Sequence, residues 1–346
     1  MSRRGLVDDR IGLKYGAGGR AMRALIEQVC LPGLVGGLAP EGIGLAALDD
    51  GAAIPVGGRW LILTTDSHVV HPIFFPGGDI GRLAVSGTVN DLAVMGATEV
   101  TALTCAVIIE EGFPRADLER VYASIRAACE EAGAAVVTGD TKVMGRGEID
   151  GLVINTAGVG FCDRPVPDAG LAPGDIVIVT GTIGDHGMAI MAARHALALE
   201  GDLRSDVAPI NGVVRAALQA GRDDVTAMKD PTRGGLSSAL HEMAQKSNVG
   251  ILIEEPAVPV KPDVRGASDL LGIDPLMMAC EGRAVIGVRP HAAAAVLDAI
   301  RAHPLGRDAA SIGRCLAGHP GTVILDTGLG RRILAESDGE PLPRIC

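Results

Sequence analysis

A stretch rich in Pro, Gly and Asp divides the chain near its middle. It reads CDRPVPDAGLAPGD, at residues 162–175, and it interrupts the hydrophobic patterns on either side. Before and after it, β-branched runs typical of strands alternate with apolar residues at helical spacing. A chain of 346 residues is also long enough for two domains. The sequence therefore predicts an α+β protein of two domains that pack together.

The chain is expected to have four parts. Residues 1–40 form a Gly-rich N-terminal segment, residues 41–162 an N-terminal domain, and residues 163–330 a C-terminal α+β domain. The segment 331–346 is polar, contains Gly and Pro, and shows no hydrophobic periodicity. Such a segment is expected to form a mobile tail, which here ends in Cys346.

Composition excludes several classes of partner. Acidic residues outnumber basic ones by 42 to 31, and no run of Lys or Arg offsets the net charge of −11. Nucleic acid and anionic membranes repel such a chain, and only 2% of the residues are aromatic and able to stack on bases. No apolar stretch is long enough to span a membrane. The seven scattered cysteines form no Cys-x-x-Cys pair, which is typical of free thiols in a reducing cytoplasm.

Aspartates recur at the ends of apolar runs or within an apolar helical pattern. They are Asp49, Asp50, Asp66, Asp91 and Asp140. Carboxylates placed in this way converge on one edge of a sheet, and oxygen ligands from several elements suit Mg²⁺ that carries nucleotide phosphates. Each aspartate alone is also compatible with a local cap or turn. The placement shared by all five favours a metal and phosphate site.

Two Gly-rich motifs add candidate phosphate contacts. In DPTRGGLSS, residues 230–238, Asp230 could cap the helix that follows, and Arg233 at the start of that helix is suited to a phosphate. KYGAGGR, residues 14–20, also precedes a helix. Either a phosphate contact or a flexible arm is compatible with this second motif.

Two charged residues are candidates for handling protons. Lys142 in TGDTK follows a strand, where a surface lysine or an active-site cation would fit. Glu281 in ACEGR lies in a turn between apolar segments. It is either a salt-bridged loop residue or a base whose pKa is raised by burial. His68 and His71 lack a nearby third metal ligand, so structural roles are expected for them.

The chain ends in PLPRIC, with a cysteine as its last residue. Prenylation needs a cysteine four residues from the end, so it does not apply. The remaining interpretations are an incidental exposed thiol and a carrier thiol on a flexible arm. Prolines would stiffen such an arm and lower the entropy cost of ordering it.

Together these motifs resemble a known family of hydrogenase maturation proteins, HypE. The motifs are KYGAGGR, LDDGA, TTDSHVVHPIFFPGGDIG, GTVNDLAVMGA, IIEEGFP, VTGDTKV, INTAGVG, GTIGDHG, DPTRGGL, ACEGR, HPLGRDAASIG and the terminal PRIC. They occur in order over nearly the whole chain. The Asp-containing motifs alone indicate the aminoimidazole-ribonucleotide-synthetase-like (PurM-like) superfamily, and the terminal PRIC indicates HypE.

The resemblance implies a fold and a set of partners. The N-terminal domain would form a β-barrel with a second subunit in a homodimer, and ATP would lie between the two domains. The partner carbamoyltransferase HypF would place a carbamoyl group on the terminal thiol. ATP would then drive its dehydration to a thiocyanate, and the HypC–HypD complex would receive the cyanide on iron for [NiFe]-hydrogenase.

The resemblance and the chemistry together assign roles to residues. Phosphorylating the carbamoyl oxygen makes it a good leaving group, and a base must then remove protons from the nitrogen. Cys346 would carry the group, and Glu281 or Lys142 would be the principal base. The expected contacts to ATP are Asp49, Asp50, Asp66, Asn90, Asp91, Asp140, Thr141, Asp230, Thr232 and Arg233. The six aspartates among these residues are the candidate Mg²⁺ ligands. Which of Asp49 and Asp50 binds the metal is left open.

Two other functions are compatible with parts of this pattern. Another ATP-using enzyme of the superfamily, of the selenophosphate synthetase or thiamine-phosphate kinase type, would share the aspartates. The first would carry a reactive Cys or selenocysteine in its Gly-rich segment, which residues 14–20 lack. The second would have no use for a terminal thiol. A non-catalytic scaffold that docks partners through its tail would need neither the aspartates nor ATP.

Overall fold

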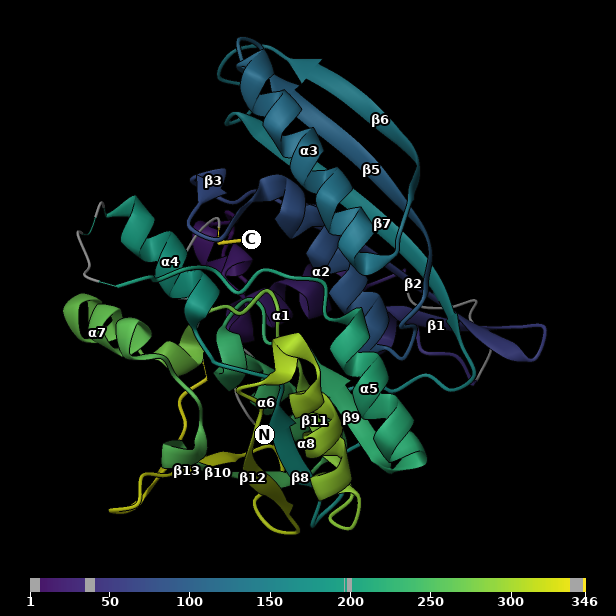
Figure 1. Ribbon diagram of the computed structural model, residues 1–346, viewed down its shortest axis with the longest axis vertical. Coiled ribbons are helices and arrows are strands. Elements are labelled where there is room, and N and C mark those ends of the chain that lie inside the picture. The colour runs from purple at the N-terminus through teal and green to yellow at the C-terminus, as the bar shows by residue number, and fades with distance from the viewer. Residues whose placement is uncertain (1–6, 35–40, 196, 198–200, 337–344) are drawn as a thin grey trace.

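The computed structural model describes residues 7–34, 41–195, 197, 201–336 and 345–346. Two sheets lie at opposite ends of the molecule, and α1 (Gly19–Leu25) lies between them (Figure 1). The first sheet uses strands from residues 52–162 and the second uses strands from residues 176–333. Short helical turns connect the elements at Leu13–Gly16, Ile26–Cys30, Leu45–Ala47, Arg222–Asp224, Glu255–Ala257, Pro275–Met277 and Pro304–Gly306.

The first sheet has five strands in the order β1, β2, β7, β5, β6. Their bounds are Ala52–Val56, Arg59–His68, Leu152–Cys162, Val100–Glu110 and Val136–Met144. All neighbours are antiparallel except the parallel pair β5 and β6. A two-stranded ribbon, β3 (Phe74–Phe75) and β4 (Gly78–Asp79), precedes α2.

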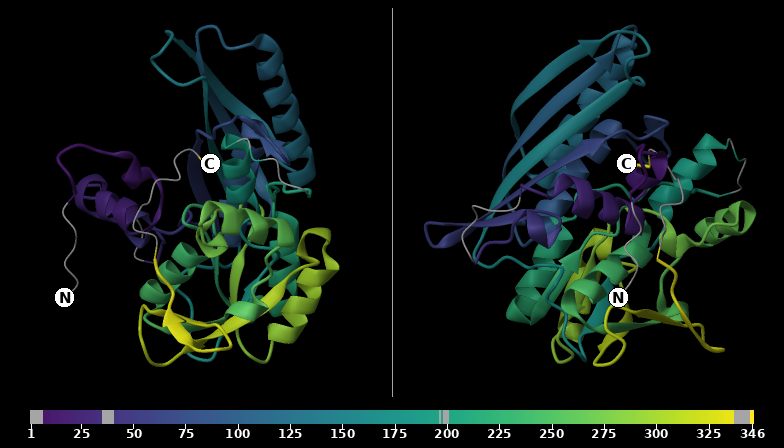
Figure 2. Two further views of the ribbon diagram at one scale, coloured as in Figure 1. Left: turned by 90° about the vertical axis from the view of Figure 1, so that its left-hand side faces the viewer. Right: turned by 180° about the vertical axis from the view of Figure 1, so that it is seen from behind.

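Two helices cover one face of this sheet. Successive side chains of β7 alternate between buried and half-buried, because only one face of the strand packs against a helix. The helices are α2 (Ile80–Val94), which Asp79 caps, and α3 (Arg115–Ala132), which ends at Gly133 with a positive φ of 66°. Seen from behind, the other face of the strands has no helix in front of it (Figure 2). The sheet therefore has one open face.

The second sheet has seven strands in the order β14, β13, β10, β12, β8, β11, β9. Their bounds are Arg331–Ile333, Val323–Asp326, Gly250–Glu254, Ala310–Leu316, Ile176–Val179, Val285–Val288 and Val225–Lys229. One core cluster contains α6 (Gly235–Ser247). Another contains α5 (Asn211–Gly221) and α8 (Ala293–Ala302). Val177 and Val179 join the α6 cluster, whereas Ile178 joins the other. The alternation along β8 shows that both faces are covered.

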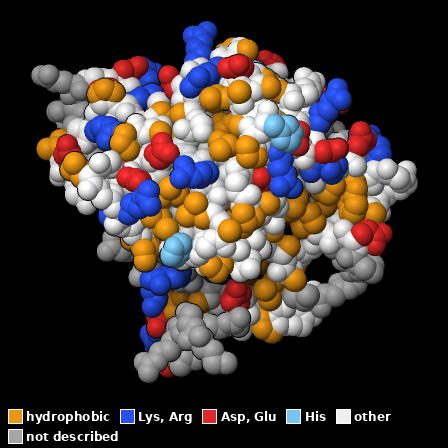
Figure 3. All heavy atoms as spheres, turned by 90° about the horizontal axis from the view of Figure 1, so that it is seen from below, with side chains coloured by type: hydrophobic (Ala, Val, Ile, Leu, Met, Phe, Trp, Pro, Cys, Tyr) orange, Lys and Arg blue, Asp and Glu red, His pale blue; other side chains and the backbone are white. Residues whose placement is uncertain are grey.

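The remaining helices, α4 (Asp185–Arg194) and α7 (Pro262–Leu271), pack against each other. Among the described residues, no helix is long and apolar enough to cross a membrane. On the face seen from below, basic and acidic side chains are interspersed (Figure 3). The described part of that face therefore shows no broad patch of one charge.

The expectation of a mobile tail from residue 331 needs correction. The segment from residue 331 does not begin as an irregular tail, because Arg331–Ile333 forms β14 against β13 and Leu334 is buried. Ile345 and Cys346 are also packed against the core, and Pro341 and Pro343 lie outside the described residues. The described strands of one chain form open sheets, and the expected barrel, which needs a second subunit, stays a prediction.

Candidate active site

A cavity of about 650 Å³ lies between the two halves of the molecule. The N-terminal segment contributes Gly19 and Arg23 to its lining. The sequence-predicted residues that line it are Asp49, Asp50, Asp66, Asp91, Asp230, Thr232, Arg233, Glu281 and Cys346. Most of the candidate residues from distant motifs thus meet around one space.

The aspartates reach the cavity from four places in the fold. Asp49 and Asp50 precede β1, Asp66 lies on β2, Asp91 on α2, and Asp230 directly follows β9. Thr64 on β2 donates a hydrogen bond to Asp91 Oδ2 at 2.8 Å. The ends of the strands and one helix therefore gather carboxyl groups where the two halves meet.

Burial and mutual repulsion raise the pKa of Asp49, Asp91 and Asp230. Burial, followed by the charges of Asp168 and Asp50, raises the pKa of Asp49 to about 7. Burial and the charge of Asp50 raise the pKa of Asp230 to about 8. For Asp91, burial and then Asp230 and Asp66 hold the pKa well above its usual range. These three carboxyl groups therefore tend to hold protons when no cation is bound, and a bound cation would favour their ionised form.

The carboxyl groups fit a hard cation such as Mg²⁺. Oxygens of Asp50, Asp230 and Glu281 are buried without a hydrogen-bond partner. Among the described residues, no three His, Cys, Asp or Glu side chains already form a metal site. Mg²⁺ in nucleotide enzymes commonly uses one or two carboxylates together with phosphate oxygens. The donor set thus suits a metal that arrives with a nucleotide.

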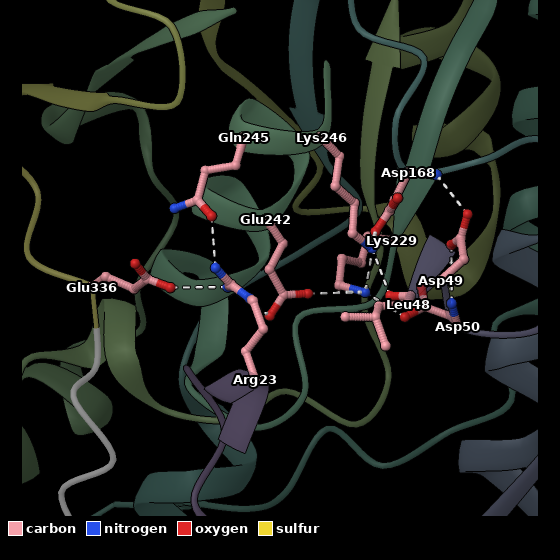
Figure 4. Close-up of polar contacts among 10 residues, drawn as sticks. All are labelled: Arg23, Leu48, Asp49, Asp50, Asp168, Lys229, Glu242, Gln245, Lys246 and Glu336. Atoms are coloured by element: carbon pink, nitrogen blue, oxygen red, sulfur yellow. Dashed lines mark hydrogen bonds and ion pairs between the residues drawn. The ribbon is translucent and has the colours of Figure 1, made fainter. Parts of the chain in front are cut away.

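A buried lysine that the sequence analysis missed lies at the centre of an ion-pair network (Figure 4). Lys229, the last residue of β9, pairs with Asp50 and lies 3.4 Å from Glu242 Oε2 and 3.6 Å from Asp168 Oδ2. Burial acts to lower its pKa, but these three carboxylates together hold the pKa well above its usual range. Its place directly before Asp230 in MKDPTRGG was the available signal.

The network extends to both ends of the chain. Lys246 Nζ lies 2.6 Å from Asp168 Oδ2, and Asp49 Oδ2 accepts from the Asp168 N–H at 3.2 Å. Arg23 on α1 pairs with Glu336 at 2.9 Å and with Glu242 at 3.4 Å. The N-terminal helix, both halves and the segment after β14 are therefore connected through charges beside the cavity.

The terminal thiol lies at the side of the cavity that holds Arg233 and Glu281. Burial raises the pKa of the Cys346 thiol, and Arg233 opposes that rise. Burial, followed by the charge of Asp230, holds the pKa of Glu281 well above its usual range. Gly18 packs on the Arg233 turn with a φ of +82°, where a Cβ would lie 2.8 Å from the Arg233 carbonyl oxygen. The Gly-rich segment therefore allows close backbone approach here.

Four expected residues lie outside the cavity lining. Asn90 donates to the carbonyls of Ala208 and Glu281 at 3.2 and 3.1 Å and accepts from the Ile210 N–H at 2.8 Å. The side-chain amide of Asn90 therefore connects the two halves. Asn90 and Asp91 lie on different faces of α2, and of these two only Asp91 lines the cavity. The other three are Asp140, Thr141 and Lys142 on β6.

The position of β6 explains why a single chain does not bring these three residues to the cavity. β6 is the outermost strand, whereas Asp66 lies on β2 near the other edge. Lys142 and Asp140 instead form an exposed ion pair at 2.8 Å, and Lys142 holds the pKa of Asp140 below its usual range. The aspartates were expected to converge on one edge of a sheet. Within a single chain, Asp140 on β6 does not join the others.

Comparisons with known proteins identify the family. The domain models described as AIR synthase related protein, N-terminal and C-terminal domain, match residues 48–162 and 172–326. The carbamoyl dehydratase HypE of Bradyrhizobium diazoefficiens is 48% identical over 355 residues, which cover 99% of this chain and 97% of that protein.

Two solved structures are similar over most of the chain. One, of a HypE–HypF complex, has a TM-score of 0.84 at 42% identity and covers 91% of this chain and all of that one. Another, of HypE in complex with ATP, has a TM-score of 0.80 at 41% identity and covers 97% of this chain and all of that one. The chain therefore belongs to the HypE family of carbamoyl dehydratases, which is built on the AIR synthase related fold.

Proposed function

We propose that this chain dehydrates a carbamoyl group on its own Cys346 to a thiocyanate at the expense of ATP. The cyanide group then becomes a ligand of iron during [NiFe]-hydrogenase maturation. The observation that carries the proposal is that the last residue of the chain lines the same cavity as the aspartates, Arg233 and Glu281. A thiamine-phosphate kinase of this fold would have no use for a thiol in that place.

The carboxylates and Arg233 would organise the nucleotide. Asp49, Asp50, Asp66, Asp91 and Asp230 are the candidate metal and phosphate ligands that a single chain supplies. Bound Mg²⁺ would neutralise phosphate oxygens and displace the protons that Asp49, Asp91 and Asp230 hold. The guanidinium of Arg233 lies beside the thiol, where it would stabilise negative charge on the group that leaves. Asp50 pairs with Lys229, and Asp49 accepts a hydrogen bond from the Asp168 N–H. Both aspartates stay candidate metal ligands.

Glu281 is suited to proton removal. In the reaction the carbamoyl oxygen leaves as phosphate and two protons leave the nitrogen, which closes the C≡N bond. Because the pKa of Glu281 is raised by burial, its ionised form would be a stronger base than an exposed carboxylate. Arg233 lowers that pKa toward the working range.

The open face of the first sheet supports a homodimer. Lys142 and Asp140 pair in register with Ile108 and Ala106, which are half-buried and lie on the side without helices. Leu63, Thr65 and Ala157 line the cavity, and the pairing of β2 with β7 places them on that side too. A second copy packed on the open face would therefore bring its β6 toward this cavity. We infer that Lys142 and Asp140 act there across the dimer, whereas Thr141, in register with the buried Val107, lies on the side of the helices.

HypF and HypC–HypD complete the proposed set of partners. A relative was solved as a HypE–HypF complex, which supports HypF as the protein that loads Cys346. HypC–HypD is expected from the resemblance as the acceptor of the cyanide. A cytoplasmic location fits the seven free cysteines.

Mass spectrometry of the C-terminal peptide tests the function. With HypF, carbamoyl phosphate, ATP and Mg²⁺, Cys346 is expected to gain one carbamoyl group and then to lose one water. Without ATP in the second step, the carbamoyl group is expected to stay. An unmodified Cys346, or modification of the exposed Cys30 instead, would refute the proposal.

The same experiment with Glu281→Gln tests the proton step. The variant is expected to accept the carbamoyl group and to fail to lose water, because glutamine keeps the shape of the side chain without its basicity. Glu254→Gln is the matched control, since Glu254 is exposed and pairs only loosely with Arg314 at 3.8 Å. Normal dehydration by Glu281→Gln would exclude Glu281 as the base.

A further inference from the structure

The last two residues are held by their backbone and by the Ile345 side chain. The Val69 N–H donates to a main-chain carboxylate oxygen of Cys346 at 3.3 Å, and His186 Nε2 lies 2.8 Å from the Ile345 carbonyl oxygen. The Ile345 side chain is 5% exposed and belongs to the core cluster that includes Phe75 and Met188. The end of the chain is therefore anchored next to the thiol and not by the thiol.

The contact from His186 has a defined direction. A carbonyl oxygen only accepts, so His186 Nε2 carries the hydrogen. The other ring nitrogen, Nδ1, then accepts from the Ser205 hydroxyl at 2.8 Å. Ser205 Oγ in turn accepts from the Val207 N–H at 3.0 Å. These contacts fix one neutral tautomer of the ring, with its donor aimed at the tail.

The anchor uses both halves of the molecule. His186 lies on α4, and its buried ring meets the ring of Phe75 on β3 edge to face at 5.4 Å. Val69 directly follows β2. The end of the chain is thus held where the two halves meet, and its release would expose a buried donor and an apolar site.

A backbone anchor is compatible with every state of the thiol. Both hydrogen bonds end on main-chain oxygens and not on the sulfur, so a carbamoyl or cyano group on the sulfur leaves their donors and acceptors unchanged. Nothing in these two contacts distinguishes a free from a loaded tail. They would hold the tail in the cavity before, during and after the reaction.

We propose that His186 is a positioning residue that docks the C-terminal Ile345–Cys346 segment, and that Ser205 fixes its docking tautomer. The strength of this dock sets the share of time that Cys346 spends in the cavity and the share in which it is free for loading. The link to loading and dehydration rests on the proposed function, whereas the dock itself does not.

Alkylation of Cys346 in the nucleotide-free, full-length protein tests the dock. The rate is followed by mass spectrometry of the C-terminal peptide. His186→Leu keeps the apolar volume and removes the donor, so alkylation is expected to be about 3- to 10-fold faster. His186→Gln restores an N–H donor and is expected to return the rate toward wild type. His291→Leu, at an exposed histidine paired with Asp224, should have no effect.

Internal controls keep this test decisive. Cys280 and Cys315 are buried and should remain unlabelled in every folded variant. If His186→Leu labels them, Ser205→Ala replaces it as the test, because this change leaves the ring in place and removes the hydroxyl that fixes its tautomer, together with the acceptor of the Val207 N–H. A wild-type rate in whichever folded variant is used, or no rescue by His186→Gln, would overturn the proposal.

The two half-reactions give a second readout. His186→Leu is expected to speed the attachment of the carbamoyl group by HypF and to slow the loss of water. A variant with merely lower stability would slow both steps, so parallel losses would contradict the dock. If wild-type Cys346 accepts no carbamoyl group, the proposed function fails, but the alkylation rates still decide whether His186 docks the tail.

Discussion

At the scale of single residues, burial decides which charges the site carries before a nucleotide binds. Asp140 is exposed, and Lys142 lowers its pKa. Asp230 is buried among other carboxyl groups, and its pKa rises to about 8. Two aspartates of the same predicted set therefore hold opposite protonation states near neutral pH. The buried one releases its proton when a cation arrives, so binding of metal should be coupled to proton release.

His186 gives a prediction about pH at this scale. Burial, with a smaller contribution from the charge of Arg194, lowers its pKa to about 4, while the hydrogen bond to Ile345 opposes that change. The folded protein thus binds fewer protons here than the unfolded chain between pH 4 and 6.5. The stability that this residue contributes is present above pH 6.5 and is lost as pH falls toward 4.

Urea unfolding of the wild type and of His186→Gln at pH 7.5 and pH 5 measures this effect. The wild type is expected to lose about 2 kcal/mol more than the variant between these two pH values. His291→Gln, at an exposed position, should behave like the wild type. Equal losses in the wild type and His186→Gln would show that the ring is not held neutral.

At the scale of elements, the described chain leaves one face of the first sheet uncovered. α2 and α3 pack on one side, and the strands present half-buried aliphatic side chains such as Val153 and Ile108 on the other. β6 adds an unpaired edge, with Val137 and Val143 62% and 69% exposed. Open apolar faces and free edges favour association with another copy.

A charge on this face should therefore separate the proposed dimer. Ile108→Lys lies beside Lys142 in the register of β5 and β6, so it would place a second positive charge on the proposed interface. The wild type is expected to be a dimer and the variant a monomer in light scattering after gel filtration. Dehydration by the variant should fall with the loss of Lys142 from the neighbouring cavity.

Leu329→Lys is the control, because Leu329 is fully exposed in the turn between β13 and β14. It should leave both mass and activity unchanged. A dimeric Ile108→Lys variant, or a monomeric wild type with full activity, would argue against the open face as the interface.

At the scale of the whole molecule, the sequence could predict the site as far as local patterns reach. Asp66 was predictable because it follows an apolar run, and Asp230 because it opens a Gly-rich motif before a helix. The strand order is set by pairings between distant segments, so nothing local placed β6 at an edge. Lys229 directly precedes Asp230, but its ion-pair role was missed because its partner Asp50 is 179 positions away. The tail was expected to be mobile, although its apolar Ile345 finds a buried place in the core.

The Lys229 network links the two halves through charges, and it supports a last prediction. Lys229→Met would leave Asp50 buried beside the cavity without its cation and would leave Glu242 with Arg23 as its partner. Removing one partner of a buried ion pair typically costs about 3–5 kcal/mol, so the free energy of unfolding in metal-free buffer should fall by about that amount. Lys142→Met makes the same change in an exposed pair and should have little effect.

The double variant Lys229→Met with Asp50→Asn shows whether the loss comes from the unpaired carboxylate. If it does, the double variant should be more stable than Lys229→Met alone, since the buried charge is removed as well. The loss should also depend on pH. Without Lys229, the pKa of Asp50 would rise further, so Lys229→Met should lose more stability at pH 8 than at pH 5.5. A loss that is the same at both pH values, and unchanged in the double variant, would mean that Lys229 stabilises the molecule by packing and not by its charge.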